Sequence, residues 1–280
     1  HGFRTTSSIF YLNSLFYLPI IKYYFFQIGA ILIMGFSCNY FIYLIKKGLK
    51  VKNYDKFFFL SLLFFLFTII FFYRIAEHGT DRSAQILIFL LIIELLFIIN
   101  FEKGIRENIV KISIILGLVI SLKSFYILYL ALILPVLYYF LIDKKFNNIL
   151  LIFKNYFFYF FLLLFSNVLF VNFANSGCLI YPVSITCFDY FSWSIPLQEV
   201  SAMNDWYEQW SKAGANPNFR VENPQEYIQH FNWVNNWFQE YFFTKVSDFI
   251  SGILFLTVIF LITFRSVSYT HLTLPTKRIV

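Results

Sequence analysis

The side chains that could take part in chemistry are few in this sequence, and they stand inside or beside long apolar runs. Asp81 precedes one such run, Glu94 lies within it, and Lys123 interrupts the next long run. Charged side chains are costly at membrane depth unless they pair or face a cavity, so each is a candidate functional residue. Glu94 also fits a simpler role, as a hydrogen-bonding or protonated acid packed between helices.

Asp81 and the cations predicted on its side of the membrane suggest two kinds of role. As a helix N-cap, Asp81 would only bind backbone amides; as a site residue, it would bind a sugar hydroxyl, a metal ion or an attacking group. Lys123 either snorkels to the interface or binds a lipid phosphate. Together the cations would form a face for a phosphate or pyrophosphate, although each alone also suits an interfacial anchor. They are Arg74, Arg82, Lys123 and Arg220.

The composition is that of a membrane protein. Of the 280 residues, 59% are hydrophobic and 13% are charged, with a mean hydropathy of +0.68, whereas a soluble domain carries about a quarter charged residues. The sequence contains no phosphate-binding glycine loop, zinc-ligand spacing or nucleophile elbow, and its histidines are scattered. We therefore expect no metal site. The basic residues cluster in short loops, which indicates membrane orientation and contact with membrane lipid, and we expect no nucleic-acid partner.

The long apolar runs predict an all-α fold, a polytopic bundle of transmembrane helices. The run 112–142 is too long for one crossing of the roughly 30 Å hydrocarbon core, and Lys123 interrupts it. We interpret Lys123 as the turn between two spans; the alternative is one tilted helix with a snorkelling lysine, which would invert every later span. The first interpretation gives about seven spans. They are 24–45, 57–73, 84–100, 107–122, 125–142, 149–172 and 246–264.

Charge predicts the orientation of these spans. The loop 46–56 is rich in lysine and holds a single aspartate, so the positive-inside rule places it in the cytoplasm. The segment 173–244 then lies outside, where its acidic residues outnumber Lys212 and Arg220. We predict that 1–265 is a membrane-domain fragment in the bacterial inner membrane, with 173–244 as its extracytoplasmic helical segment.

Three amphipathic helices are predicted outside the spans. A short one starts at Ser8 and ends at Phe16, before Pro19. A second contains Val200, Met203, Tyr207 and Trp210 at helical spacing and stops near Gly214. A third begins with a capping box at Asn223-Pro224-Gln225-Glu226 and leads into the last span.

The three cysteines divide into two groups. Cys178 and Cys187 lie in the predicted extracytoplasmic segment, where they either form a disulfide or remain two free thiols. Cys38 stands in an apolar run and is expected to be a small core residue.

The two ends of the sequence predict a fragment with a foreign tail. The chain starts at His1 without a signal peptide, so we expect its true start to be missing. Residues 267–280 resemble the conceptual translation of a transposon sequencing adaptor, and we expect 266–280 to be a non-native tail. A genuine cytoplasmic tail is the alternative.

Three stretches resemble bacterial GT-C-type membrane glycosyltransferases. HGTDRSAQIL, residues 78–87, is similar to the aspartate-bearing loop that starts one of their spans. LVISLKS, residues 118–124, resembles their span that ends in a lysine, and NSGCLIYP, residues 175–182, resembles the turn that follows a later span. The polar start, residues 3–14, resembles the end of their first outer loop. Within this class the chain is similar to multi-span proteins of marine bacteria grouped as an LIC-type membrane protein family.

The resemblance implies a transferase that takes a sugar from a polyprenyl-phosphate donor, for cell-envelope glycan or lipid glycosylation. In that class the main catalytic base lies in the first outer loop, upstream of His1, so we expect the fragment itself to be inactive. The turn at 175–182 departs from the class pattern, because Cys178-Leu-Ile stands where a proline and leucine are usual. The predicted catalytic residue is Asp81, and the predicted substrate-binding residues are Lys123, Arg82, Tyr181 and Arg220.

Two other functions share the many spans and the large outer segment. One is a flippase or transporter for a lipid-linked glycan, which needs broken helices near the midplane, with Gly29, Gly35 and Gly117 as candidate breaks. The other is an O-antigen-type polymerase, which uses a lipid-linked oligosaccharide donor. The sequence specifies no cofactor. A divalent cation is the one cofactor that these functions leave open. The expected partners are membrane lipid and a polyprenyl-phosphate sugar.

Overall fold

The protein is mainly helical in the part of the chain that the structure describes. The structure is a computed structural model that describes residues 7–17, 19–20, 22, 27–71, 80–101, 104–247, 250–254 and 257–258. The strands among these residues are β1 (Ala215–Asn216) and β2 (Phe219–Arg220), which pair antiparallel. The prediction of an all-α fold is confirmed. The chain forms two compact units, residues 1–204 and 205–280.

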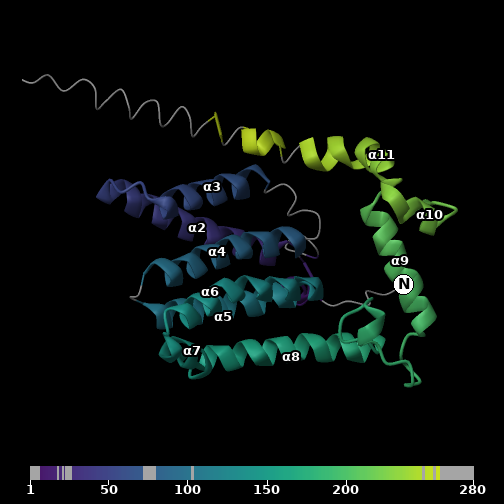
Figure 1. Ribbon diagram of the computed structural model, residues 1–280, viewed down its shortest axis with the longest axis horizontal. Helices are drawn as coiled ribbons and strands as arrows, with labels where there is room; N and C mark the ends of the chain where they lie inside the picture. Colours follow the sequence, from purple (N-terminus) through teal and green to yellow (C-terminus); the bar gives the residue numbers. More distant parts are fainter. Residues whose placement is uncertain are drawn as a thin grey trace, which may run out of the picture. The chain divides into compact units, whose positions relative to one another are not determined.

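The first unit is a bundle of long helices that lie side by side (Figure 1). Its helices are α1 (Ser8–Leu15), α2 (Ile28–Val51), α3 (Lys56–Ile70), α4 (Thr80–Asn100), α5 (Ile105–Leu122), the 3-10 helix η3 (Ser124–Ile133), α6 (Leu134–Ile142), α7 (Phe146–Phe153) and α8 (Tyr156–Ser176). α5 lies at the centre and packs against both α4 and α8. The largest apolar core between these helices includes Leu91, Leu116, Ile120, Phe140 and Phe161.

Four helices are long and apolar enough to cross a membrane. They are α2, α4 from Asp81 onward, the continuous stretch Phe125–Ile142 of η3 and α6, and α8. α3 is apolar but has only 15 residues, and α5 carries charged side chains in its first two turns. Length and composition therefore support four of the seven predicted spans. Of the predicted span 246–264, the residues 246–247, 250–254 and 257–258 are described and helical.

Two polar side chains fix where helices begin at one end of this bundle. Asp55 accepts hydrogen bonds at Oδ1 from the amides of Phe57 and Phe58, both at 3.0 Å, and so caps α3. Asn155 caps α8 in the same way, because its Oδ1 accepts from the amide of Phe157 at 2.9 Å. The cap at Asn155 divides the predicted run 149–172 into α7 and α8.

α4 runs antiparallel to both α3 and α5. Lys56, at the start of α3, donates a hydrogen bond to Asn100 at the end of α4. Lys123, just after α5, donates to Asp81 at the start of α4. α8 runs parallel to α5, since a Cβ on Gly117 would meet Leu164 at 3.0 Å, and Phe158 lines the same pocket as Ile109 near the start of α5.

The bundle therefore has two distinct ends. We call the end with the turns 52–55, 143–145 and 154–155 the basic end, because the lysines of these turns and of the neighbouring ends of α2 and α3 gather there. The opposite end, where α4 begins and where α5 and α8 finish, is the Asp81 end. The helical structure is interrupted at Lys123, whose backbone is extended, with φ −161° and ψ 128°.

The short helix α1 is present where the sequence predicts it, with a different cap. Ser7, rather than Ser8, stands at the N-cap position and makes no side-chain cap. Ser8 instead shares a hydrogen bond with Ser121 of α5, with 2.7 Å between the hydroxyl oxygens. Asn13 accepts from the Gly29 amide at 3.0 Å, and any Cβ on Gly29 would meet Asn13 Oδ1 at 2.9 Å. α1 therefore packs directly on the start of α2.

The chain turns sharply after α8. Gly177 takes the left-handed conformation, φ +78°, that ends the helix, and a Cβ there would meet Ser194 Cβ at 2.5 Å. Cys178 and Cys187 are joined by a disulfide around the short 3-10 helix η4 (Ser184–Thr186). Cys178 packs with Tyr181 and with Val200 of α9 (Leu197–Ser211). The amphipathic helix predicted around Val200 is confirmed.

The second unit contains the end of α9, the β1–β2 hairpin and a series of short helices. These are α10 (Pro224–Ile228), the 3-10 helix η5 (Gln229–Phe231), α11 (Val234–Trp237) and the π-helix η6 (Phe238–Val246). The sequence predicts one continuous helix from Asn223 onward, and this prediction is wrong. His230 and Phe231 have positive φ values of 50° and 61°, so the helix breaks there.

Candidate functional site

Asp81, Lys123 and Tyr126 form a polar cluster at the Asp81 end of the bundle, which we call the Asp81 cluster. Lys123 Nζ donates to Asp81 Oδ1 at 2.9 Å, and the Tyr126 hydroxyl donates to the same oxygen at 2.7 Å. Asp81 Oδ2 accepts no hydrogen bond from the residues that the structure describes. The cluster thus holds one carboxylate oxygen in place and leaves the other able to accept a proton or a ligand donor.

Local structure explains why these three side chains meet. Asp81 lies in the first turn of α4, where the positive end of the helix dipole stabilises a carboxylate. The Tyr126 amide donates to the Lys123 carbonyl at 2.9 Å, and the 3-10 geometry of about three residues per turn places their side chains on one face. Because α4 and α5 run antiparallel, the start of one lies beside the end of the other. Asp81 is therefore not the N-cap that the sequence allows, and Lys123 pairs with it instead of only reaching the interface.

The Asp81–Lys123 ion pair is accessible. The Asp81 side chain is 62% exposed and the Lys123 side chain 49% exposed. An exposed ion pair contributes only about 0–1 kcal/mol to stability. The pair therefore contributes little to the stability of the fold. This favours a role for it in binding.

The other predicted site residues do not all gather at this cluster. Arg82 follows Asp81 and donates to Gln85 at 2.6 Å, with its guanidinium 5.5 Å from the centre of the Phe71 ring. Tyr181 is buried in the separate group around the Cys178–Cys187 disulfide. Arg220 belongs to the second unit, where its Nε donates to Gln209 at 3.0 Å. Arg74 lies outside the described residues.

Glu94 is the most deeply buried charged residue among those that the structure describes. It is 1% exposed. Lys111 Nζ lies 3.2 Å from its Oε1 and 3.3 Å from its Oε2, and the Tyr40 hydroxyl donates to Oε1. The acid therefore joins α2, α4 and α5. This geometry matches the simpler role given to Glu94 in the sequence analysis, an acid that forms hydrogen bonds between packed helices.

Three participants in these clusters were not identified from the sequence. Tyr126 stands three residues after Lys123. In a 3-10 helix this spacing places both side chains on one face, so a predicted 3-10 turn would have identified Tyr126. Tyr40 and Lys111 are separated from Glu94 by 54 and 17 positions, so no local pattern links them.

The sequence also suggests helix breaks at three glycines and leaves a divalent cation open. α2 continues through Gly35, and α5 continues through Gly117, so neither glycine breaks its helix. Gly29 stands in the first turn of α2 beneath α1. Among the described residues, His, Cys, Asp and Glu do not form a group of three or more that could hold a metal ion.

Comparison with known proteins identifies the family. No curated protein and no solved structure matches the chain. The family model described as "Domain of unknown function (DUF8201)" matches residues 2–276, which includes residues 266–276 of the segment set aside above as a tail. Because this match covers nearly the whole chain, the protein belongs to the DUF8201 family.

Proposed function

We propose that this protein is an integral membrane glycosyltransferase that uses a polyprenyl-phosphate-linked sugar donor, in cell-envelope glycan or lipid glycosylation. The observation that carries the proposal is the exposed Asp81–Lys123 pair at the end of the bundle opposite the basic turns. A carboxylate and an ammonium group at one accessible point are the two groups that such a transfer needs. The resemblance of residues 78–87 and 118–124 to GT-C-type enzymes supports the same assignment.

The arrangement of the helices supports an outward-facing Asp81 end. Lysines of α2, of the turn 52–55 and of the start of α3 lie at the basic end, and the positive-inside rule places such an end in the cytoplasm. In this orientation the shorter α3 and the charged α5 also cross the bilayer, and 246–264 forms the last of seven spans. The segment 173–244 is then extracytoplasmic in a bacterial inner membrane. The Cys178–Cys187 disulfide fits that oxidising side.

The Asp81 cluster can be assigned roles in an inverting transfer. Asp81 Oδ2 accepts the proton of the acceptor hydroxyl while the acceptor oxygen attacks the anomeric carbon of the sugar. The bond between that carbon and the lipid phosphate breaks, and the phosphate oxygen leaves with the electron pair. Lys123 stabilises the departing phosphate, with Arg82 as a second cation close in the sequence. Tyr126 keeps the carboxylate oriented through Oδ1.

The test is transfer of a labelled sugar from a polyprenyl-phosphate donor by a longer family member, reconstituted in liposomes. We expect Asp81→Asn and Lys123→Ala, placed at the corresponding positions, to reduce turnover by a factor on the order of 100 or more. The matched control is the Asp143–Lys145 ion pair at the basic end, whose charged atoms lie 3.0 Å apart. Asp143→Asn and Lys145→Ala should leave turnover unchanged. Full turnover in the Asp81 and Lys123 variants would refute the site.

A further inference from the structure

A pocket of about 500 Å³ lies at the basic end of the bundle, between α2, α3, α4 and α5. This size is within the range of small-molecule sites, roughly 300–1,000 Å³. One wall is aromatic: the rings of Phe57 and Phe97 stack with centroids 4.3 Å apart, and Phe101 lies 5.4 Å from Phe57. Gly48 permits the close approach of Phe58 to α2, because a Cβ there would meet Phe58 Cδ2 at 2.7 Å.

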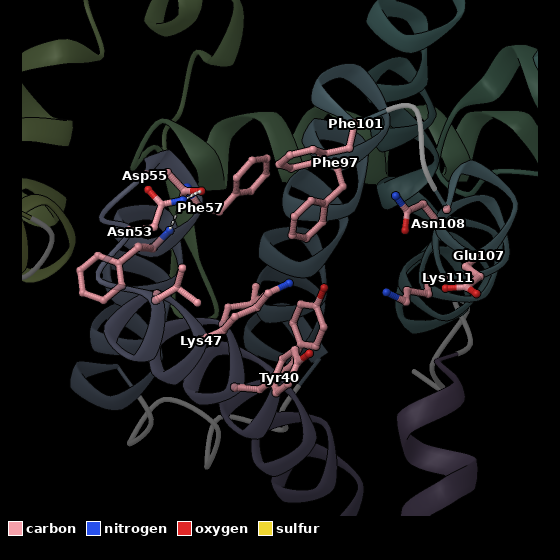
Figure 2. Close-up of a pocket in the computed structure, with 16 residues that line it drawn as sticks. Tyr40, Lys47, Asn53, Asp55, Phe57, Phe97, Phe101, Glu107, Asn108 and Lys111 are labelled. Carbon is pink, nitrogen blue, oxygen red and sulfur yellow. Dashed lines mark hydrogen bonds between the residues drawn. The ribbon is translucent and has the colours of Figure 1, made fainter.

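Two lysines reach into this pocket from opposite sides. Figure 2 shows Lys47 of α2 and Lys111 of α5 pointing toward one another across it. Lys111 pairs with the buried Glu94, yet 45% of the lysine side chain stays exposed. Lys47 makes no hydrogen bond or ion pair with the residues that the structure describes. Asn108, which is 9% exposed, adds an amide to the lining.

Three carboxylates line or underlie the pocket, and two of them have hydrogen-bond partners within the bundle. Asp55 Oδ1 accepts both capping amides of α3. Glu94 is bonded to Lys111 and Tyr40. Glu107, in the first turn of α5, also lines the pocket and keeps its negative charge there. An anion can bind where the ammonium of Lys47 and the open side of Lys111 face one another, with Asp55 and Glu107 elsewhere in the lining.

We propose that this pocket binds the phosphate of an anionic glycerophospholipid, held by Lys47 and Lys111. The aromatic wall of Phe57, Phe97 and Phe101 contacts the glycerol and the first acyl carbons. Basic pockets between membrane helices on the cytoplasmic side are suited to anionic headgroups. A site for a free phosphate would gain nothing from the aromatic wall, which favours a lipid as the source of the phosphate.

The experiment is a lipid titration of the purified, delipidated full chain in detergent, followed by native mass spectrometry. Phosphatidylglycerol, phosphatidylcholine and inorganic phosphate are the probes. We expect phosphatidylglycerol to bind best, and Lys47→Ala to weaken it about fivefold, the factor expected for one lysine near an anionic surface. The matched control is Lys50→Ala, which removes another exposed lysine of α2 that lies outside the pocket. It should bind as the wild type does.

A second pair of variants tests the pocket by volume instead of charge. Val51 lines the pocket and is 67% exposed, whereas Leu49 is 51% exposed and lies outside the lining. Val51→Trp should abolish the tightly bound phosphatidylglycerol, and Leu49→Trp should retain it. Thermal unfolding without lipid checks that all four variants fold.

Three results would overturn the proposal. They are equal binding by Lys47→Ala and Lys50→Ala, equal affinity for phosphatidylcholine, and inorganic phosphate binding as tightly as phosphatidylglycerol. The last result would show a site for a soluble anion. Because the readout is lipid binding at the basic end, it stays independent of glycosyl transfer at the Asp81 cluster.

Discussion

Lys111 Nζ lies 3.2 Å from Glu94 Oε1, and this ion pair ties α5 to a carboxylate that the bundle buries almost completely. Tyr40 of α2 donates a hydrogen bond to the same oxygen, so three helices depend on one acid. An ionised acid in a helix bundle is stable only while its partners remain. The pair therefore links the packing of the bundle to a polar network beside the pocket.

The first prediction concerns this network. Lys111→Met should destabilise the protein by about 3 kcal/mol, the lower end of the range for a broken buried pair, because Lys111 is half exposed. The double variant Lys111→Met/Glu94→Gln should recover most of the loss, since the buried charge is removed with its partner. Thermal unfolding in detergent measures both. A single variant as stable as the wild type would show that the pair contributes nothing.

A second prediction separates positioning from stability at the Asp81 cluster. Tyr126→Phe removes a donor to Asp81 Oδ1 and, at the corresponding position of the longer family member, should lower glycosyl transfer about tenfold, the effect of one hydrogen bond to a charged group. Its unfolding temperature should stay unchanged. Tyr129→Phe is the control, because Tyr129 is the next tyrosine of η3 and contacts the Tyr126 ring without bonding Asp81. Equal rates in the two variants would remove Tyr126 from the site.

A third prediction tests how closely α5 and α8 pack. A Cβ on Gly117 would already lie 3.0 Å from Leu164 Cδ1, so Gly117→Leu should destabilise the bundle by about 1–3 kcal/mol through overpacking. Gly35 has nothing within 4 Å of its Cβ position, so Gly35→Leu on α2 is the matched control. Unfolding temperatures of the two variants should differ clearly. Identical temperatures would contradict the close contact.

The fourth prediction is a thiol count. Cys178 and Cys187 form a disulfide and Cys38 is free. Titration of the denatured, unreduced protein should therefore find one thiol per chain, and titration after reduction should find three. Cys38→Ala should bring the first value to zero. Three thiols before reduction would exclude the disulfide.

A fifth prediction addresses orientation. Alkaline phosphatase is active only outside the cytoplasm, so a fusion after Trp206 should be active and one after Lys145 should be inactive. The reverse result would place the Asp81 end in the cytosol. The proposed transfer from a lipid-linked donor on the outer face would then be wrong, while the lipid pocket would face the outer leaflet.

Much of the helical bundle follows from the apolar runs. The length of run 112–142 together with Lys123 was enough to locate the break between α5 and η3. The sequence does not indicate that α2 continues to Val51, because a lysine-rich stretch is typical of a loop, although lysine is also a good helix former. That extra helical length is what places Lys47 in the pocket wall.

The partners within the bundle could not be predicted from the same patterns. Tyr40 and Lys111 contact Glu94 only because three helices pack together. A single sequence has no local pattern that predicts this contact. The break at His230 and Phe231 is equally hidden, because both are non-glycine residues with positive φ. Asp81 and Lys123 could be proposed one by one, but their pairing depends on the antiparallel arrangement of α4 and α5.

The break at Lys123 has a consequence for how this protein enters the bilayer. One residue separates α5 from η3, so these two helices have almost no connecting loop to translocate. In the proposed orientation, they can insert together as a hairpin whose tip carries the single charge of Lys123 across. Pairing with Asp81 would then anchor that tip as soon as α4 is in place, and biogenesis of the bundle would itself bring the two site residues together.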